Sequence, residues 1–164
     1  MKKIGLLSDT HGWLNPAVFD FFKDCDEIWH VGDIGSTDVA DALSAFKPLR
    51  AVYGNVDDYR IRRMFNWIEI FTIENVKVIM THIGGYPNHY EPDIRELIIQ
   101  EEPDIFISGH SHILKVINDK KLNLLHINPG AAGNSGFHKV MTMVRFEIDG
   151  SEVRNMEIYE KARG

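Results

Sequence analysis

The hydrophobic residues in the first third of this chain fall in short continuous runs that alternate with segments of helical spacing. A continuous apolar run predicts a strand, and apolar residues three or four positions apart predict one face of a helix. In chain order we predict a strand at Lys3–Ser8, a helix at Pro16–Asp24, a strand at Glu27–Val31, a helix at Thr37–Phe46 and a strand at Leu49–Tyr53.

The rest of the chain is richer in strand-like runs and holds one further helical pattern. Alternating strands and helices followed by hairpins indicate a mixed α/β fold. A length of 164 residues is typical of one domain, so we treat residues 1–164 as a single domain. We predict strands at Trp67–Ile73, Val76–Thr81, Ile105–Ser108, Leu114–Asn118, Leu122–Ile127, Val140–Ile148 and Glu152–Tyr159, and a helix at Pro92–Glu101.

Five of the predicted strands run directly into an Asp, Asn or His, usually beside a glycine. In open α/β sheets, ligands bind outside the carboxyl ends of the strands, so side chains placed there converge although they are distant in sequence. An isolated Asp or Asn after a strand is usually a cap or a turn former. Capping does not explain four histidines at matching strand ends. The candidate ligands are Asp9, His11, Asp33, Asn55, His82, His110 and His112.

This set of side chains offers carboxylate, imidazole and amide groups without thiolate. Such a mixed nitrogen and oxygen set suits Mn²⁺, Fe, Zn²⁺, Ni²⁺ or Co²⁺ better than the oxygen cages of Ca²⁺. Seven ligands are too many for one ion. We therefore expect two divalent metal ions about 3.5 to 4 Å apart, with one carboxylate bridging them, and Mn²⁺ is the metal that we favour.

The order of motifs is Asp9-Thr-His11, Gly32-Asp33, Gly54-Asn55-Val-Asp57, Thr81-His82 and Gly109-His110-Ser-His112. From Lys3 to about Gly130 the chain resembles the calcineurin-like metallophosphoesterase superfamily, and within it the small single-domain phosphodiesterase branch. The resemblance implies a four-layer α-β-β-α sandwich of two mixed sheets flanked by helices. The late strands, which we expect to be antiparallel hairpins, suit the second of these sheets. It also implies that Asp9, His11 and His112 hold the first metal, that Asn55, His82 and His110 hold the second, and that Asp33 bridges both.

The function implied by the resemblance is a binuclear-metal-dependent phosphodiesterase. It would hydrolyse small or activated phosphodiesters through attack of metal-bound hydroxide on phosphorus. Many relatives carry a histidine after the metal-binding asparagine that can protonate the leaving group, and this chain has Val56 there. The segment Ile83–Tyr90 also departs from the short Gly-His pair of close relatives. The alternatives are a phosphomonoesterase and a protein-binding scaffold like the retromer subunit that shares this fold.

The residues around these motifs allow more than one interpretation. We count Asp33, Asn55 and Asp57 as candidate catalytic residues, and Asp57 could equally orient a ligand histidine or stabilise its turn. A core position is expected for His30, which lies inside a strand. Three further histidines are candidates for substrate contacts, namely His89, His126 and His138. The arginines at 60, 62 and 63 are expected on the solvated surface, with guidance of an anionic substrate as the alternative.

Charge and cysteine content limit the partners and the compartment. A formal net charge of −6 argues against general nucleic-acid binding, which needs a basic surface. Cys25 is the only cysteine, which excludes a disulfide within the chain, and the sequence begins with a strand-like segment rather than a signal peptide. We expect a cytoplasmic protein with a small-molecule phosphoester substrate and no membrane association. The resemblance also allows a homo-oligomer.

Overall fold

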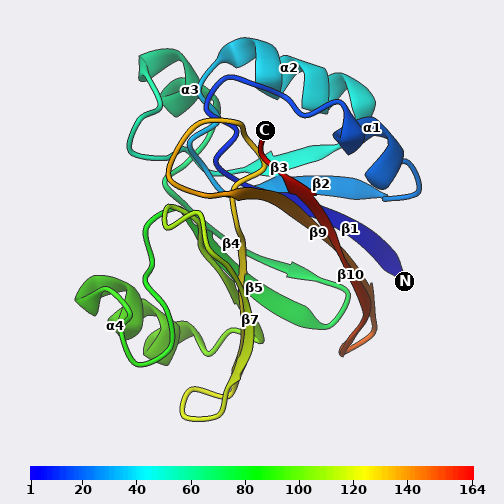
Figure 1. Cartoon of the computed structure of the whole chain (residues 1–164). Helices are drawn as coiled ribbons and strands as arrows, with labels where there is room; N and C mark the ends of the chain where they lie inside the picture. The colour runs from blue at the N-terminus through cyan, green and yellow to red at the C-terminus, as the bar shows by residue number, and fades with distance from the viewer.

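The first of two sheets combines strands from both ends of the chain. A computed structural model describes residues 1–164 and contains ten strands and four helices (Figure 1). In this sheet β1, β2 and β3 are parallel, β9 is antiparallel to β1, and β10 is antiparallel to β9. The strand order is β10 (Glu152–Ala162), β9 (Val140–Asp149), β1 (Lys2–Leu7), β2 (Glu27–His30) and β3 (Leu49–Ala51).

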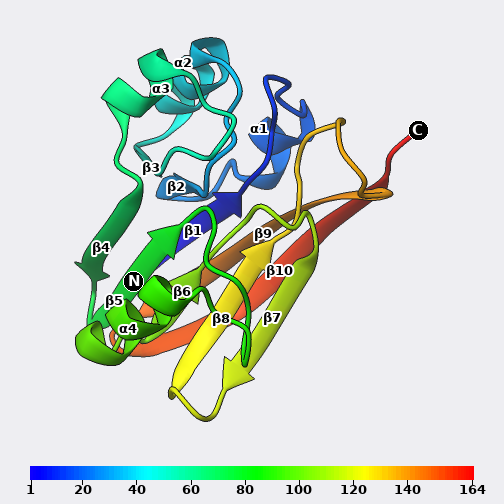
Figure 2. The same cartoon turned by 90° about the vertical axis from the view of Figure 1, so that its left-hand side faces the viewer.

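The second sheet is built from the middle of the chain and is also mixed (Figure 2). Its three central strands β5, β6 and β8 are parallel, and an antiparallel strand closes each edge. The strand order is β4 (Ile68–Ile73), β5 (Val76–Thr81), β6 (Ile105–Ile107), β8 (Leu124–Pro129) and β7 (Leu114–Asp119).

Helices cover the outer faces of both sheets, so the four-layer sandwich expected from the sequence is confirmed. Three helices pack on the first sheet, and α4 packs on the second (Figures 1 and 2). None of the helices combines the length and the apolar composition that a membrane span requires. The helices are α1 (Ala17–Phe21), α2 (Thr37–Phe46), α3 (Tyr59–Met64) and α4 (Pro92–Glu101).

The main hydrophobic core lies between the two sheets. It consists of 15 buried side chains, which include Trp29 of β2, Met80 of β5 and Phe146 of β9. Alternate residues of each strand point inward, and burial of each large apolar side chain contributes roughly 1.5 to 3 kcal/mol. The hydrophobic core does not extend beyond the ends of the strands. The loops that follow the strands can therefore hold polar side chains.

Three features of the fold differ from the sequence prediction. The basic segment at 59–64 forms α3, whose only buried residue is Ile61. The β9–β10 hairpin was expected in the second sheet, but β9 pairs with β1 in the first. The late strands are not all antiparallel, because β8 runs parallel to β6. Strand pairing over such sequence distances is decided by tertiary packing, which periodicity along the chain does not report.

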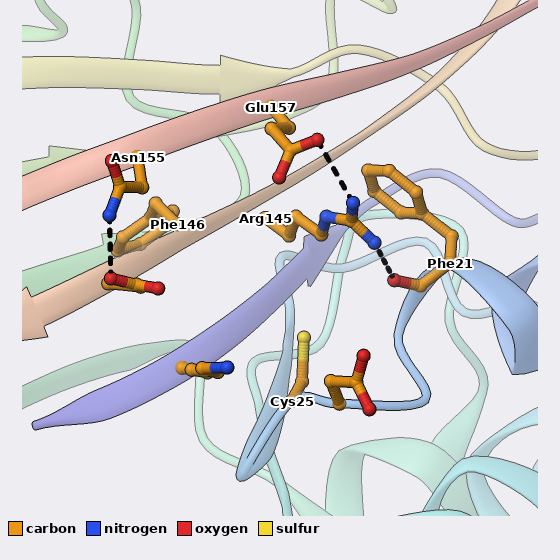
Figure 3. A pocket seen from close by; sticks show the side chains of 9 residues that line it. Phe21, Cys25, Arg145, Phe146, Asn155 and Glu157 are labelled. Atoms are coloured by element: carbon orange, nitrogen blue, oxygen red, sulfur yellow. Dashed lines mark hydrogen bonds and ion pairs between the residues drawn. The ribbon is translucent and has the colours of Figure 1, made fainter.

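A small pocket of about 130 Å³ lies beside β9 and β10, and Figure 3 shows its lining. Arg145 Nη1 donates a hydrogen bond to the Phe21 carbonyl at 2.8 Å, and Arg145 Nη2 pairs with Glu157 at 3.0 Å. Burial raises the pKa of the Cys25 thiol to about 11, so this thiol stays protonated. The pocket contains none of the predicted site residues, and it is therefore separate from the predicted site.

Candidate metal centre

Six side chains with metal-ligating atoms form two clusters where the carboxyl ends of strands from both sheets meet. They lie in the loops after β1, β2, β5 and β6. In each cluster the potential ligand atoms lie within 4.8 Å of one another. The first cluster contains Asp9, His11 and His112, and the second contains Asp33, His82 and His110.

The two clusters contact each other through their carboxylates. In the first, Asp9 Oδ1 lies 3.2 Å from His112 Nε2 and 3.7 Å from His11 Nε2. Asp33 Oδ2 lies 3.1 Å from His82 Nε2 in its own cluster and 3.6 Å from His11 Nε2 in the other. An oxygen that faces both clusters has the position expected of a bridging ligand.

Asn55, the seventh predicted ligand, adjoins the second cluster. It follows β3 and is exposed at the rim of the site. Its Oδ1 lies 3.2 Å from His110 Nδ1. The structure thus brings together all seven residues predicted as ligands, although they are spread from position 9 to position 112.

Hydrogen bonds hold the outer side of these groups and leave the inner side free. Ser8 Oγ and the His110 amide both donate to Asp9 Oδ2, at 2.7 and 3.2 Å. His82 Nδ1 donates to the Val31 carbonyl at 2.7 Å, which leaves the lone pair on Nε2. Asp9 Oδ1 and His82 Nε2 are buried and have no hydrogen-bond partner. Because such orphaned atoms are rare in folded proteins, the donor set fits divalent cations.

The carboxylates of both clusters are held in the ionised form. Burial raises the pKa of Asp9, but the adjoining His11 and His112 imidazoles outweigh burial and hold this pKa well below its usual range. Burial also raises the pKa of Asp33, and the His82 imidazole more than offsets that effect, so this pKa is lowered too. Both groups are therefore anionic ligands at neutral pH.

The backbone at these positions is strained. A positive φ is uncommon outside glycine, although Asp, Asn and His tolerate it better than most residues. Such conformations cluster at functional sites, where they aim a side chain that ordinary backbone would direct elsewhere. Half of the ten non-glycine residues with positive φ are candidate ligands, namely Asp9 (54°), His11 (49°), Asp33 (52°), His110 (72°) and His112 (63°).

Two glycines before candidate ligands make room for a ligand from another strand. A Cβ at Gly32 would lie 2.7 Å from His82 Nδ1. A Cβ at Gly54 would overlap the side chain and amide of Asp33. The glycines beside these motifs therefore do more than let the chain turn. Gly32 permits the close approach of His82 from the second sheet, and Gly54 permits that of Asp33 from the neighbouring loop of the first sheet.

Asp57 stabilises the loops and lies outside both clusters. Its buried carboxylate accepts hydrogen bonds from the amides of Ile34, Gly35 and Gly54, at 3.2, 2.8 and 2.7 Å. These contacts join the loop after β2 to the loop after β3. They correspond to the turn-stabilising alternative, and no hydrogen bond joins Asp57 to a ligand histidine.

Arg62 is a structural residue that the sequence did not single out from its basic neighbours. Its Nε donates to the Asp57 carbonyl at 2.7 Å, and its Nη2 donates to the Asn55 carbonyl at 3.2 Å. The guanidinium lies over the Tyr53 ring, 4.9 Å from its centroid. Arg62 thus braces the loop that carries Asn55. A basic residue one helical turn into α3 was the only signal in the sequence.

His138 contacts the candidate ligand His112. Its Nε2 donates to the Gly133 carbonyl at 2.7 Å, and its Nδ1 lies 3.1 Å from His112 Nδ1. Both ring nitrogens are thus engaged. The sequence singled out His138 only as a histidine beside a glycine-rich loop, and the position of that loop against His112 is a tertiary feature.

The other histidines divide into a core residue and two residues at a cavity. His30 is fully buried, donates to Thr10 Oγ1 at 3.0 Å and accepts from the Gly32 amide at 3.1 Å. Burial lowers the pKa of His30 to about 3, so it is a neutral core histidine. His89 and His126 line a cavity that also contains His110.

The chain is similar to known proteins over most of its length. Residues 1–151 match the model of the calcineurin-like phosphoesterase superfamily domain. A protein from Methanothermobacter thermautotrophicus named "Probable metallophosphoesterase" is 34% identical over 136 residues, which cover 78% of this chain and 76% of the relative.

Solved structures show the same fold at lower identity. An archaeal phosphodiesterase has a TM-score of 0.75 at 23% identity, and the match covers 96% of this chain and 99% of that one. Vps29 from Entamoeba histolytica, solved in complex with Zn²⁺, has a TM-score of 0.75 at 19% identity, with 99% of both chains covered.

Proposed function

The chain belongs to the calcineurin-like phosphoesterase superfamily, and from this premise we propose that it is a phosphodiesterase that uses two divalent metal ions. The family places it among phosphoric ester hydrolases. The finer proposal is that it hydrolyses small or activated phosphodiesters, with Mn²⁺ as the metal that we expect in both positions.

The observation that carries this proposal is the contact between the two ligand clusters. Each cluster offers three ligand atoms, and Asp33 Oδ2 faces histidine nitrogens of both. We assign Asp9, His11 and His112 to one metal, and His82, His110 and Asn55 to the other, with Asp33 as the bridge. When bound, two cations held by these residues would supply a water of lowered pKa and would offset the negative charge that builds up on the phosphoryl oxygens.

The protein's own contribution is to prepare and orient these groups. The outer oxygen of Asp9 accepts a hydrogen bond and the outer nitrogen of His82 donates one, and these bonds direct Asp9 Oδ1 and His82 Nε2 into the site. Asn55 stands at the exposed rim, where its amide can contact a phosphoryl oxygen. Preorganised groups of this kind lower the barrier because they do not have to reorient during the reaction.

The residue after Asn55 favours diesters with good leaving groups. Val56 is 53% exposed, and its amide donates to Asp33 Oδ1 at 3.0 Å. Its side chain cannot donate a proton, so this position gives no general-acid help to a departing alkoxide. A leaving group of low pKa needs no such help, which is why activated diesters are the proposed substrates.

The test is hydrolysis of bis-p-nitrophenyl phosphate by metal-stripped protein, with and without Mn²⁺, beside p-nitrophenyl phosphate as the monoester. We expect turnover that depends on Mn²⁺ and favours the diester. Asp33→Asn should abolish this turnover, and Asp20→Asn is its matched control, because Asp20 is an exposed aspartate on α1.

Two other results of this assay would point to a different function. A higher rate on the monoester would replace the proposal with a phosphomonoesterase. Bound metal without hydrolysis of either ester, with Mn²⁺ or another divalent ion, would contradict the enzyme proposal and favour a protein-binding scaffold.

A further inference from the structure

A cavity of about 410 Å³ opens beside the second ligand cluster, and His110 is part of its wall. The cavity lies between the segment Ile83–Glu91 and residues of β7 and β8. A phosphoester bound at the metal centre would therefore have room for one organic group on this side. The volume falls within the range of about 300 to 1,000 Å³ that is typical of small-molecule sites.

The lining of this cavity combines apolar surface with polar side chains. Only three of its thirteen lining residues are hydrophobic. A fatty acyl chain would leave the polar side chains of this lining without partners, whereas an organic group with a flat ring and polar atoms can use both kinds of surface. The lining favours an organic group that makes hydrogen bonds itself.

His126 is a buried histidine behind the wall of this cavity. Its side chain lies on β8 and is fully buried, and neither ring nitrogen has a partner in the chain. Burial and the charge of Lys115 lower its pKa to about 4, so the ring is neutral near pH 7. A neutral imidazole offers one N–H donor and one acceptor.

Two exposed aromatic rings stand at the same cavity. Tyr86 is 45% exposed, and its ring lies 4.8 Å from the ring of His89. Lys115 Nζ lies 4.2 Å from the Tyr86 centroid and forms no ion pair. Because this long side chain is held by no carboxylate, a planar ring can replace it on the tyrosine face. Stacking on aromatic side chains is a common way in which proteins hold nucleobases.

We propose that this cavity binds a nucleoside as the organic group of the substrate, with the base at Tyr86 and the phosphate toward His110. This inference rests on the proposed function, because it assumes that the phosphorus atom of the substrate lies at the metal centre. It assigns the segment Ile83–Tyr90, whose sequence departs from that of close relatives, to substrate selection.

The experiment compares three phosphate monoesters that differ only in their organic group. Methyl phosphate, ribose 5-phosphate and adenosine 5′-monophosphate are titrated into the Mn²⁺-loaded protein by calorimetry. We expect the nucleotide to bind at least about tenfold more tightly than ribose 5-phosphate, which matches the usual contribution of one stacked base. Tyr86→Ala should remove this difference, and Tyr86→Phe should keep it, because the phenyl ring still stacks.

Tyr59→Ala serves as the matched control, since Tyr59 is an exposed tyrosine on α3 with Arg60 beside its ring. Equal affinity for the nucleotide and ribose 5-phosphate in the unmodified protein would overturn the inference. So would a preference that survives Tyr86→Ala.

Hydrolysis of bis-p-nitrophenyl phosphate, measured on the same samples, separates this inference from the proposed function. If the diester is hydrolysed but the base adds no affinity, the nucleoside subsite is wrong and the enzyme stands. If the base adds affinity through Tyr86 but no ester is hydrolysed, the subsite stands and the proposed activity is wrong.

Discussion

We expect His138→Ala to weaken binding of one of the two metal ions and to leave the other unchanged. The Gly133 carbonyl can only accept a hydrogen bond, so His138 Nε2 must carry its proton. A neutral His138 then has a lone pair on Nδ1, and His112 Nδ1 must donate to it across 3.1 Å. The lone pair of His112 is thereby placed on Nε2, which faces Asp9 at 3.2 Å.

The size of the effect follows from what His138→Ala removes. One net hydrogen bond contributes about 0.5 to 1.5 kcal/mol, and the edge-on contact of the two rings, with centroids 4.9 Å apart, is lost as well. Without its acceptor, His112 can also adopt the other tautomer. Removal of such an outer partner typically lowers metal affinity about 10- to 100-fold, or roughly 1.4 to 2.7 kcal/mol.

The assay is calorimetric titration of metal-free protein with Mn²⁺, which resolves two binding events if their affinities differ. His138→Asn should restore part of the affinity, because its Oδ1 occupies the position of the histidine Nδ1 and can accept from His112. Phe137→Ala is the control, since this neighbouring side chain is fully exposed. Unchanged affinity of both ions in His138→Ala, or an equal loss in Phe137→Ala, would refute the reasoning.

Four further predictions concern the two sheets' loops and the cavity. Asp33→Asn should weaken metal binding and abolish hydrolysis with an unchanged circular dichroism spectrum, and full activity would contradict the bridging role. Gly54→Ala should lower Mn²⁺ affinity in the same titration, because its Cβ would overlap Asp33; unaltered affinity would argue against the close packing. Asp57→Asn should lower the free energy of unfolding in urea by about 2 to 3 kcal/mol, because three backbone amides lose their charged acceptor, and a loss below about 0.5 kcal/mol would contradict that role. The pKa of His126 is lowered to about 4, so the unfolded chain binds the proton more tightly and the metal-free protein should lose stability as pH falls from about 6.5 to 4. In urea unfolding, His126→Phe should reduce this pH-dependent fall in the free energy of unfolding by up to about 3 kcal/mol. The same pH profile in both proteins would refute the lowered pKa of His126.

The elements with strong local signals have the bounds that the sequence predicts. α2 and α4 begin and end at the predicted residues, and β5 does so as well. Ser36 caps α2 by accepting from the Val39 amide, and Pro92 stands in the first turn of α4. Where capping, periodicity and burial agree, local reasoning is sufficient.

The features that were missed depend on contacts between distant segments. α3 has six residues and one buried side chain, which is too short for a periodic pattern. The hairpin of β9 and β10 alternates in the same way whichever sheet it joins. Its place is decided by the pairing of Lys2 with Ile148, across nearly the whole chain.

The candidate ligands could be predicted because the ends of strands can be recognised in a sequence. The residues that hold these ligands in place could not be predicted in this way. Asp33 and His82 each follow an apolar run, so a local pattern locates them. His138 contacts His112, which lies 26 positions away in the sequence, and Arg62 contacts Asn55, which lies 7 positions away. Nothing in the sequence around either residue indicates which carbonyl or ring it will face.

The left-handed backbone at five candidate ligands should make the abundance of this protein depend on metal supply. Each such residue costs about 1 kcal/mol or more, so the folded chain without metals gives up several kcal/mol of its stability at this edge. Ions that bind only the folded state return that stability by mass action. In a metal-starved cell the unfolded fraction should therefore rise, and proteases act on that fraction. Metal shortage would then lower the amount of this protein as well as its activity.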